Sequence, residues 1–278
     1  PGLITIMPAS APAGMAGGPN PEVHRSPMSQ FAKVLQVLDL FSEARITLAA
    51  EEIADLLDVS RPTAFRYVKQ LCETGLLAKI AGRYALGAKI IELDYRIRRS
   101  EPILLASRAS MRELAQRTAM TVVLCNIYGD EIVHSHHELV GELAPMSLDR
   151  GHLMPLFKGA ASAVILANLP AARLKRLYER HQADAEVRAI AGDWTSFSRH
   201  YKRIRKDGHY VSREEIDPGV IGIAAPIFND GRHVVGATTL VYEKKREKLV
   251  NEEGYAELVR HCAAAVTQEI AASAQLAT

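Results

Sequence analysis

The chain has 278 residues, a hydrophobic content of 48% and a charged content of 24%, which are ordinary values for a soluble globular protein. At roughly 100 to 200 residues per domain, this length predicts two domains. The formal net charge of +2 is too small to indicate nucleic-acid binding by itself, so a DNA-binding surface would require positive charge to be segregated along the chain.

Cysteine usage and hydropathy exclude two further classes of protein. Cys72, Cys125 and Cys262 are far apart and lie in apolar sequence, which is neither a disulfide framework nor a metal-binding motif. No apolar run reaches the roughly 18 residues that a membrane span needs. The run GAASAVILANLPAA, between Lys158 and Arg173, has 14 residues. We therefore expect a cytoplasmic protein.

Residues 1–28 are rich in proline, glycine, alanine and serine. They lack a basic region followed by a long apolar core, so they predict a disordered arm and not a signal peptide. The pattern changes at Gln30, where helical periodicity begins.

Three helices are predicted next. Apolar residues recur at helical spacing over residues 30–43, QFAKVLQVLDLFSE, which predicts one amphipathic helix. The third helix, residues 61–74, follows Ser60 as N-cap and stops at Gly75. The second helix, residues 48–59, is expected to bury Ile53, Ala54, Leu56 and Leu57.

The segments GLLAKI and RYALG, on either side of a turn at Gly82, predict a β-hairpin. The second and third helices are joined by a tight turn, as in a helix-turn-helix motif. Residues 29–87 therefore predict a winged helix-turn-helix DNA-binding domain.

The charge of this domain is unevenly distributed. Acidic residues gather on the second helix, and basic residues on the third helix and the hairpin. When the apolar side of the third helix faces inward, a phenylalanine and several bases face outward, where arginine can read guanine, phenylalanine a thymine methyl and lysine a phosphate. The alternative is an ordinary solvated face. The predicted DNA-binding residues are Ser60, Arg61, Pro62, Thr63, Phe65, Arg66, Lys69, Lys79 and Arg83.

Residues 88–112 predict a helical linker with a break at Glu101-Pro102, because the residue before proline resists the α conformation. Its apolar stripe is larger than one slender helix can bury. The stripe predicts either dimerisation or packing against its own domain. It comprises Ile90, Ile91, Leu93 and Ile97.

Strands and helices are mixed in residues 113–278. The predicted strands are residues 121–129, 131–138, 143–148, 209–213, 219–229 and 233–243, with Gly129-Asp130 as a hairpin turn. Helices are predicted from about Gly159 and over residues 171–181, 196–208 and 251–274. The whole predicts an α+β protein with an N-terminal winged helix-turn-helix domain, a helical linker and a C-terminal GAF- or PAS-like α/β effector domain with an antiparallel sheet.

The start of the helix near Gly159 is a candidate anion site. Its first amides lack intrahelical partners and, together with the helix dipole, attract negative charge. Gly159, Ala160 and Ala161 have little or no side chain, so a ligand carboxylate can reach those amides. The alternative is that the small residues only allow close packing on the sheet. Lys158 either supplies positive charge there or lies in solvent.

The segments SRPTAFRYVKQLCETGLL, RYALG, GHLMPLFKGAASAVILANLP and DGHYVSREEIDPGVIGIAAPIFNDGRHVVGATTL resemble the IclR family of bacterial transcription regulators. The resemblance covers about residues 30–274. It implies a homodimer or dimer of dimers that binds a double-stranded DNA operator, expected to be palindromic. It also implies a C-terminal domain that binds a small carboxylate effector and thereby alters operator binding, whether as repressor or as activator.

The resemblance places the effector carboxylate on Ala160 and Ala161. It places the pocket lining on Leu143, Met146, Met154, Ser212, Val220, Gly222, Thr239 and Val241. The last four lie in i, i+2 pairs on two strands and share one face of the sheet. The mixture suits a carboxylate on an apolar or aromatic body. Two positions depart from the family: Ser162-Ala163 replaces a common Gly-Lys pair, and Ser212 stands where some members have an acid.

Two alternatives compete with this interpretation. A hydrolase would need a base near Ser162, and the segment lacks the G-x-S-x-G motif, so we expect no enzyme and no cofactor. A zinc site would use His134 and His136 on one strand face, with His137 beside them. Histidines on a half-exposed strand are more often simply solvated, so we expect no metal.

Overall fold

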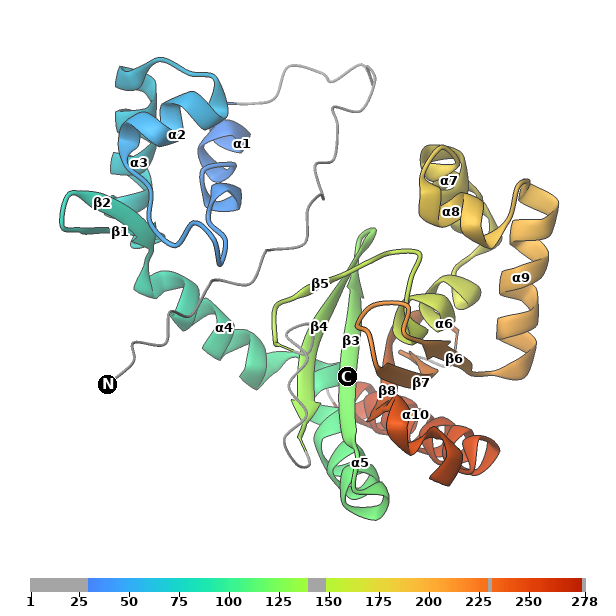
Figure 1. Cartoon of the computed structure of the whole chain (residues 1–278). Helices are drawn as coiled ribbons and strands as arrows, with labels where there is room; N and C mark the ends of the chain where they lie inside the picture. The colour runs from blue at the N-terminus through green and yellow to red at the C-terminus, as the bar shows by residue number, and fades with distance from the viewer. Residues whose placement is uncertain (1–29, 140–148, 230–231, 277–278) are drawn as a thin grey trace, which may run out of the picture. The chain divides into compact units, whose positions relative to one another are not determined.

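The computed structural model describes residues 30–139, 149–229 and 232–276, in two compact units. The first unit ends at Tyr95 and the second begins at Arg96. Figure 1 shows the elements of both. The predicted arm, residues 1–28, the predicted strand 143–148, and the candidate residues Leu143 and Met146 lie outside the described residues.

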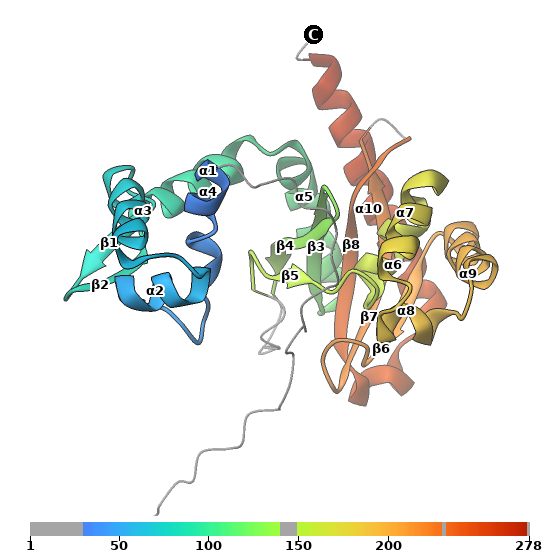
Figure 2. The same cartoon turned by 90° about the horizontal axis from the view of Figure 1, so that it is seen from above.

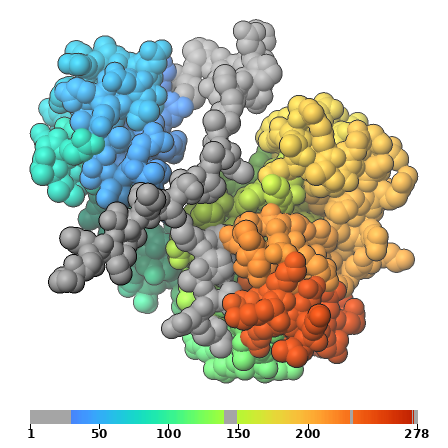
Figure 3. All heavy atoms as spheres, viewed as in Figure 1, coloured from blue at the N-terminus to red at the C-terminus, as the bar shows by residue number. Residues whose placement is uncertain are grey.

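The first unit contains α1 (Gln30–Leu35), a 3₁₀ turn (Leu38–Leu40), α2 (Ala50–Leu57) and α3 (Arg61–Glu73). The antiparallel hairpin β1 (Leu77–Ile80) and β2 (Arg83–Leu86) follows, and α4 (Ala88–Ser100) begins after it. The hairpin turns through Ala81 and Gly82, both with positive φ. This confirms the predicted helix-turn-helix with a wing, which belongs to the blue and teal surface in Figure 3.

The predicted single helix over residues 30–43 is wrong. Hydrogen bonds from Val37 onward reach three residues back instead of four. A 3₁₀ turn rotates successive side chains further than an α-helix does, and it brings Val37, fully buried, into the core, whereas Phe31 stays 71% exposed. The prediction that Leu56 is buried is also wrong. It is 46% exposed because α2 directs Ile53 and Ala54 inward.

The second unit is built on a six-stranded antiparallel sheet with strand order β5-β4-β3-β8-β7-β6. From one edge to the other, the strands are β5 (Leu153–Met154), β4 (Glu131–Glu138), β3 (Thr121–Tyr128), β8 (Val234–Glu243), β7 (Val220–Phe228) and β6 (Tyr210–Arg213). The hairpin turn predicted at Gly129-Asp130 joins β3 and β4, and Gly129 has φ +55°.

Helices cover both faces of this sheet (Figure 2). One face packs on α5 (Pro102–Thr118) and α10 (Glu252–Leu276), and the other on α6 (Ala160–Asn168), behind which lie α7 (Ala171–His181), α8 (Ala185–Ile190) and α9 (Trp194–Asp207). A further 3₁₀ segment, Lys244–Leu249, precedes α10. The α+β class is confirmed. Neither α8 nor this segment was predicted.

Helix α6 is buried along its whole length. Its alanines allow a close approach to the sheet. A Cβ added to Gly222 on β7 would lie 3.5 Å from the Cβ of Ala160 and 3.4 Å from both Ser212 Oγ and Thr239 Cγ2. The start of α6 therefore rests directly above β6, β7 and β8.

Candidate functional site

Helix α3 presents two faces of opposite character. Ala64, Tyr67, Val68 and Leu71 are buried, as predicted. The opposite face is solvent-exposed and carries Arg61, Pro62, Phe65, Arg66 and Lys69. Phe65 is 47% exposed, so its ring is accessible beside the bases of this face.

A hydrogen bond lies at the start of α3, and a cation–π contact lies on the hairpin. Ser60 precedes the helix in an extended conformation, and its hydroxyl pairs with that of Thr63 at 2.9 Å. On the hairpin, Lys79 lies with its ammonium 5.9 Å from the centre of the Tyr84 ring. Ser60, Thr63 and Lys79 therefore belong to the same unit as the exposed face of α3.

Arg83 forms hydrogen bonds within the first unit that could not be predicted from the sequence. Its Nη2 donates to Glu52 Oε2 at 2.6 Å and to the Thr47 carbonyl at 3.1 Å, while Nε donates to Thr47 Oγ1 at 3.1 Å. The guanidinium thus ties the hairpin to α2. The same Glu52 carboxylate accepts the Ala49 amide, and that bond, aided by Arg83, lowers the pKa of Glu52.

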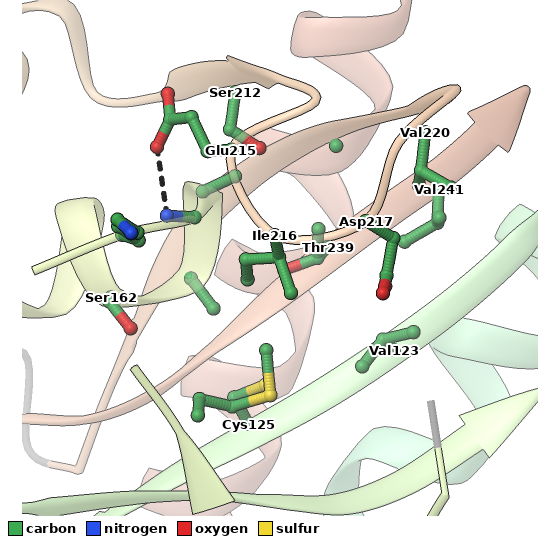
Figure 4. A pocket seen from close by; sticks show the side chains of 16 residues that line it. Val123, Cys125, Ser162, Ser212, Glu215, Ile216, Asp217, Val220, Thr239 and Val241 are labelled. Atoms are coloured by element: carbon green, nitrogen blue, oxygen red, sulfur yellow. Dashed lines mark hydrogen bonds between the residues drawn. The ribbon is translucent and has the colours of Figure 1, made fainter. Parts of the chain in front are cut away.

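A pocket in the second unit collects the candidate effector residues (Figure 4). It holds about 530 Å³ of empty space, counting its opening to solvent. All eight of those candidates that the structure describes line it: Met154, Ala160, Ala161, Ser212, Val220, Gly222, Thr239 and Val241. They come from five different elements, which the fold brings together at the start of α6.

The start of α6 forms one wall of the pocket. Gly159 is its N-cap, with φ +86° and ψ 158°, a conformation open essentially only to glycine. Ala163 is the first residue whose amide reaches back to a helix carbonyl, that of Gly159, at 3.1 Å. Ala160 and Ala161 are each 4% exposed, and their amides have no carbonyl one turn earlier to accept them.

Glu215, which sequence reasoning missed, reaches this helix start from the loop between β6 and β7. Its Oε2 accepts the Gly159 amide at 2.8 Å, and its Oε1 accepts the Tyr210 hydroxyl at 2.9 Å. Burial, with the nearby Glu215 charge, raises the pKa of Tyr210 to about 12. No sequence motif marks Glu215, because the contact joins residues 56 positions apart.

Lys158 lines the same pocket and forms an ion pair with Glu186 at 3.0 Å. Lys158 therefore lies at the pocket, and its ammonium is paired with Glu186.

The rest of the lining is mostly apolar. Val123 and Cys125 of β3 add to the predicted wall, and burial raises the pKa of the Cys125 thiol to about 12, which keeps the thiol protonated. Thr239 is one of its polar residues, with Ser212 and Asp217. It is 6% exposed, and among the residues that the structure describes its buried Oγ1 has no hydrogen-bond partner. Burial also raises the pKa of the Asp217 carboxyl at the pocket, against the opposing effect of His152.

The hydrolase alternative gains no support from this geometry. Ser162 is 1% exposed, and its Oγ donates to the Pro155 carbonyl at 2.6 Å. A hydroxyl committed to a backbone carbonyl and shielded from solvent is not arranged as an activated nucleophile.

The prediction that His134 and His136 share a strand face is wrong. A register shift pairs Cys125 with His134 but Leu124 with His136, so the two imidazoles lie on opposite faces of the sheet. His134 is fully buried, while His136 pairs with Glu138 at 3.1 Å and has a pKa lowered mainly by burial. Within the described ranges, no three His, Cys, Asp or Glu side chains are grouped to hold a metal ion.

None of the helices in the described part of the chain is both long and apolar enough to cross a membrane.

Comparison with known proteins gives consistent relatives. The HTH-type transcriptional regulator XynR of Escherichia coli is 28% identical over 211 residues, which cover 75% of this chain and 83% of the relative. The glycerol operon regulatory protein of Streptomyces coelicolor is 27% identical and covers 85% of this chain and 94% of its own length. An IclR homologue from Microbacterium hydrocarbonoxydans, solved in complex with 4-hydroxybenzoate, superimposes with a TM-score of 0.69 at 21% identity, covering 88% of this chain and all of that one.

Two family models match the chain, and they correspond to its two units. The model of the IclR helix-turn-helix domain matches residues 31–80. The model of the bacterial transcriptional regulator IclR C-terminal domain matches residues 97–268, more than half of the chain. The chain therefore belongs to the IclR family of DNA-binding transcriptional regulators, which join a helix-turn-helix domain to a C-terminal effector domain.

Proposed function

We propose that this regulator senses a small organic carboxylic acid in the pocket at the start of α6. The observation that carries the proposal is the meeting of three features in one pocket. These are the amides of Ala160 and Ala161, which have no acceptor within the helix, the Thr239 hydroxyl, which has no hydrogen-bond partner among the described residues, and an apolar wall. Helix amides bind anions, a buried hydroxyl needs a polar partner, and an apolar wall binds the body of a ligand.

The apolar wall favours a compact hydrophobic or aromatic body. Val220 and Val241 on the sheet and Met154 on β5 supply it. The Microbacterium homologue of the same fold was solved with 4-hydroxybenzoate, an acid of this class, which supports the choice of aromatic acids as first candidates.

The same proposal assigns the exposed face of α3 to operator DNA. Arg61 and Arg66 would read guanine edges, Phe65 would contact a thymine methyl, and Lys69 and Lys79 would bind phosphates. The hydroxyls of Ser60 and Thr63 fix the start of the helix. Arg83 contributes by holding the hairpin to α2 through Thr47 and Glu52.

We further propose that the regulator acts as a homodimer or dimer of dimers on a palindromic operator in the cytoplasm, with residues 29–87 as DNA-binding domain, 88–112 as linker and 113–278 as effector domain. The supporting observation is α4, which buries none of its residues. Ile91 and Tyr95 on it are 70% and 54% exposed, an apolar surface that a second copy would cover.

The effector proposal is tested by a thermal-shift screen of small aliphatic and aromatic acids, followed by calorimetric titration of the hits. Thr239→Val keeps the volume of the side chain and removes its hydroxyl. We expect it to weaken binding of the best acid about tenfold, which is the loss of one hydrogen bond, about 1.4 kcal/mol. Acids that stabilise wild type and Thr239→Val equally would contradict the assignment of the pocket.

A second variant tests the helix start. Ala161→Asp places a fixed negative charge where the ligand carboxylate would bind, so effector binding should disappear while operator binding persists. The matched control is Ala171→Asp, the same change at the exposed start of α7. If both variants titrate like wild type, the carboxylate does not bind at α6.

A further inference from the structure

The start of α6 already carries a carboxylate that belongs to the chain itself. Glu215 Oε2 accepts the amide of Gly159 at 2.8 Å, and Figure 4 draws this hydrogen bond as a dashed line from the Glu215 carboxylate. The Tyr210 hydroxyl holds the other oxygen at 2.9 Å. The Glu215 carboxylate therefore occupies the first of the helix amides that would attract the carboxylate of a ligand.

Two carboxylates cannot share this position without cost. Like charges a few ångströms apart in a partly buried site repel strongly. The neighbouring residue adds a steric obstacle, because Ile216 packs on Gly159 so closely that a Cβ there would overlap its Cδ1. A ligand carboxylate at the neighbouring amides of Ala160 and Ala161 would therefore be repelled by Glu215 for as long as Glu215 stays on Gly159.

A second cavity can take up the displaced Glu215 side chain. Glu215 and Lys158 line a second cavity as well as the first, and His200 and Tyr210 also line the second one. Burial lowers the pKa of His200, and the charge of Glu215 opposes that shift, so the carboxylate and the imidazole interact. Lys158 offers an ammonium there, now shared with Glu186 at 3.0 Å.

Hydrogen bonds hold the two ends of the loop that carries Glu215. Glu214 accepts the Gly219 amide at 2.8 Å, and the Lys244 amide donates to the Gly219 carbonyl at 2.8 Å. These bonds fix the ends of the loop without involving Gly159. The side chain of Glu215 can therefore leave the helix while the loop stays anchored.

A second observation points to a ligand in the same pocket. Thr239 is more than nine-tenths buried, and its Oγ1 has no hydrogen-bond partner among the described residues. Glu215 satisfies the Gly159 amide but leaves this hydroxyl unsatisfied, so the internal carboxylate completes only part of the site.

We propose that Glu215 is an internal competitor of the effector: its carboxylate caps α6 in the ligand-free protein, and the effector carboxylate displaces it toward Lys158 and His200. The inference rests on the proposed carboxylate site and assigns its regulation. The affinity for an acid then depends on how much more favourably the effector carboxylate binds the helix start than the Glu215 carboxylate does. The ligand-free protein has a defined conformation, in which Glu215 caps α6.

The test uses sodium acetate as the probe, at constant ionic strength, on the full chain labelled with ¹⁵N at glycine and alanine. The amide shifts of Ala160 and Ala161 report binding. Glu215→Gln keeps the shape of the side chain and removes its charge, and we expect it to bind acetate about tenfold more tightly than wild type, the loss of one charge-assisted competing bond. Tyr210→Phe, which only loosens Glu215, should bind acetate a few-fold more tightly.

Glu214→Gln is the matched control, since it removes a charge from the same loop without touching Gly159. An equal gain in Glu214→Gln would overturn the proposal, because the effect would then come from loosening the loop. Equal acetate affinity in wild type, Glu215→Gln and Tyr210→Phe would overturn the competitor and leave the carboxylate site standing. No shift at Ala160 or Ala161 in any variant would overturn both.

Discussion

Replacing Gly159 with alanine is expected to destabilise the second unit and to weaken effector binding together. The backbone of Gly159 has φ +86° and ψ 158°, which a residue with a Cβ adopts only under strain. The added Cβ would also overlap Cδ1 of Ile216 and lie 3.1 Å from its Cγ1. The substitution therefore affects the helix start and the loop above it at once.

The magnitude follows from these two effects. A residue held in a glycine-only conformation costs about 1–3 kcal/mol. The overlapping atom is Cδ1, the flexible end of the Ile216 side chain, which can move aside. We therefore assign most of the loss in the free energy of unfolding to the backbone, about 2 kcal/mol. For a unit of this size, that corresponds to a fall in Tm of roughly 4–8 °C.

The single tryptophan of the chain makes the assay specific. Trp194 lies on α9, with its ring 5.6 Å from that of Tyr178 and 6.1 Å from that of Phe197. Its fluorescence during denaturation therefore follows the second unit alone. Gly192→Ala is the control, since a Cβ there meets no atom within 4 Å. Equal unfolding midpoints for the two variants would refute the strain at Gly159.

Three further predictions concern other parts of the chain. Arg66→Ala should weaken operator binding by about 1–3 kcal/mol in a gel-shift titration, whereas Arg199→Ala, on α9, should leave it unchanged; equal losses would remove α3 as the recognition helix. Arg83→Ala should lower the thermal stability of the first unit by about 1 kcal/mol, through the lost bonds to Thr47, and an unchanged melting curve would contradict that role. Burial raises the pKa of Cys125 to about 12, so its thiol is protonated at pH 8 and should resist alkylation in the folded protein. The reactive thiolate forms only as the pH rises toward 12 or the unit unfolds. Mass spectrometry after iodoacetamide treatment measures this, and rapid modification of Cys125 at pH 8 would argue against its burial.

The faces of regular elements could be predicted from the sequence because periodicity encodes them. Every third or fourth residue of α3 is apolar, so Ala64, Val68 and Leu71 could be placed inside and Phe65 outside. On β7 and β8, spacing predicts that Val220 and Gly222, and Thr239 and Val241, share one face of the sheet, whereas their place in the pocket came from the resemblance to the family. Where the backbone stays regular, side-chain direction follows from spacing alone.

Irregular backbone and long-range contacts could not be predicted in this way. The register shift in β4 puts His134 and His136 on opposite faces, although two residues apart in a regular strand share one. The exposure of Leu56 depends on how α2 meets its neighbours. The bonds from Glu215 to Gly159 and from Arg83 to Thr47 join loops and strand ends far apart in sequence, and no local pattern specifies them.

The amides at the start of α6 belong to the main chain, and every residue type except proline supplies one. Any other substitution at Ala160 or Ala161 changes what surrounds those amides but leaves them in place. The side chains of Val220, Val241 and Met154, by contrast, change with any substitution at those positions. In the proposed effector site, recognition of charge and recognition of ligand body would therefore be inherited separately. A point mutation in the sheet would then change which acid the pocket accepts, while the main-chain amides for the acid group persist.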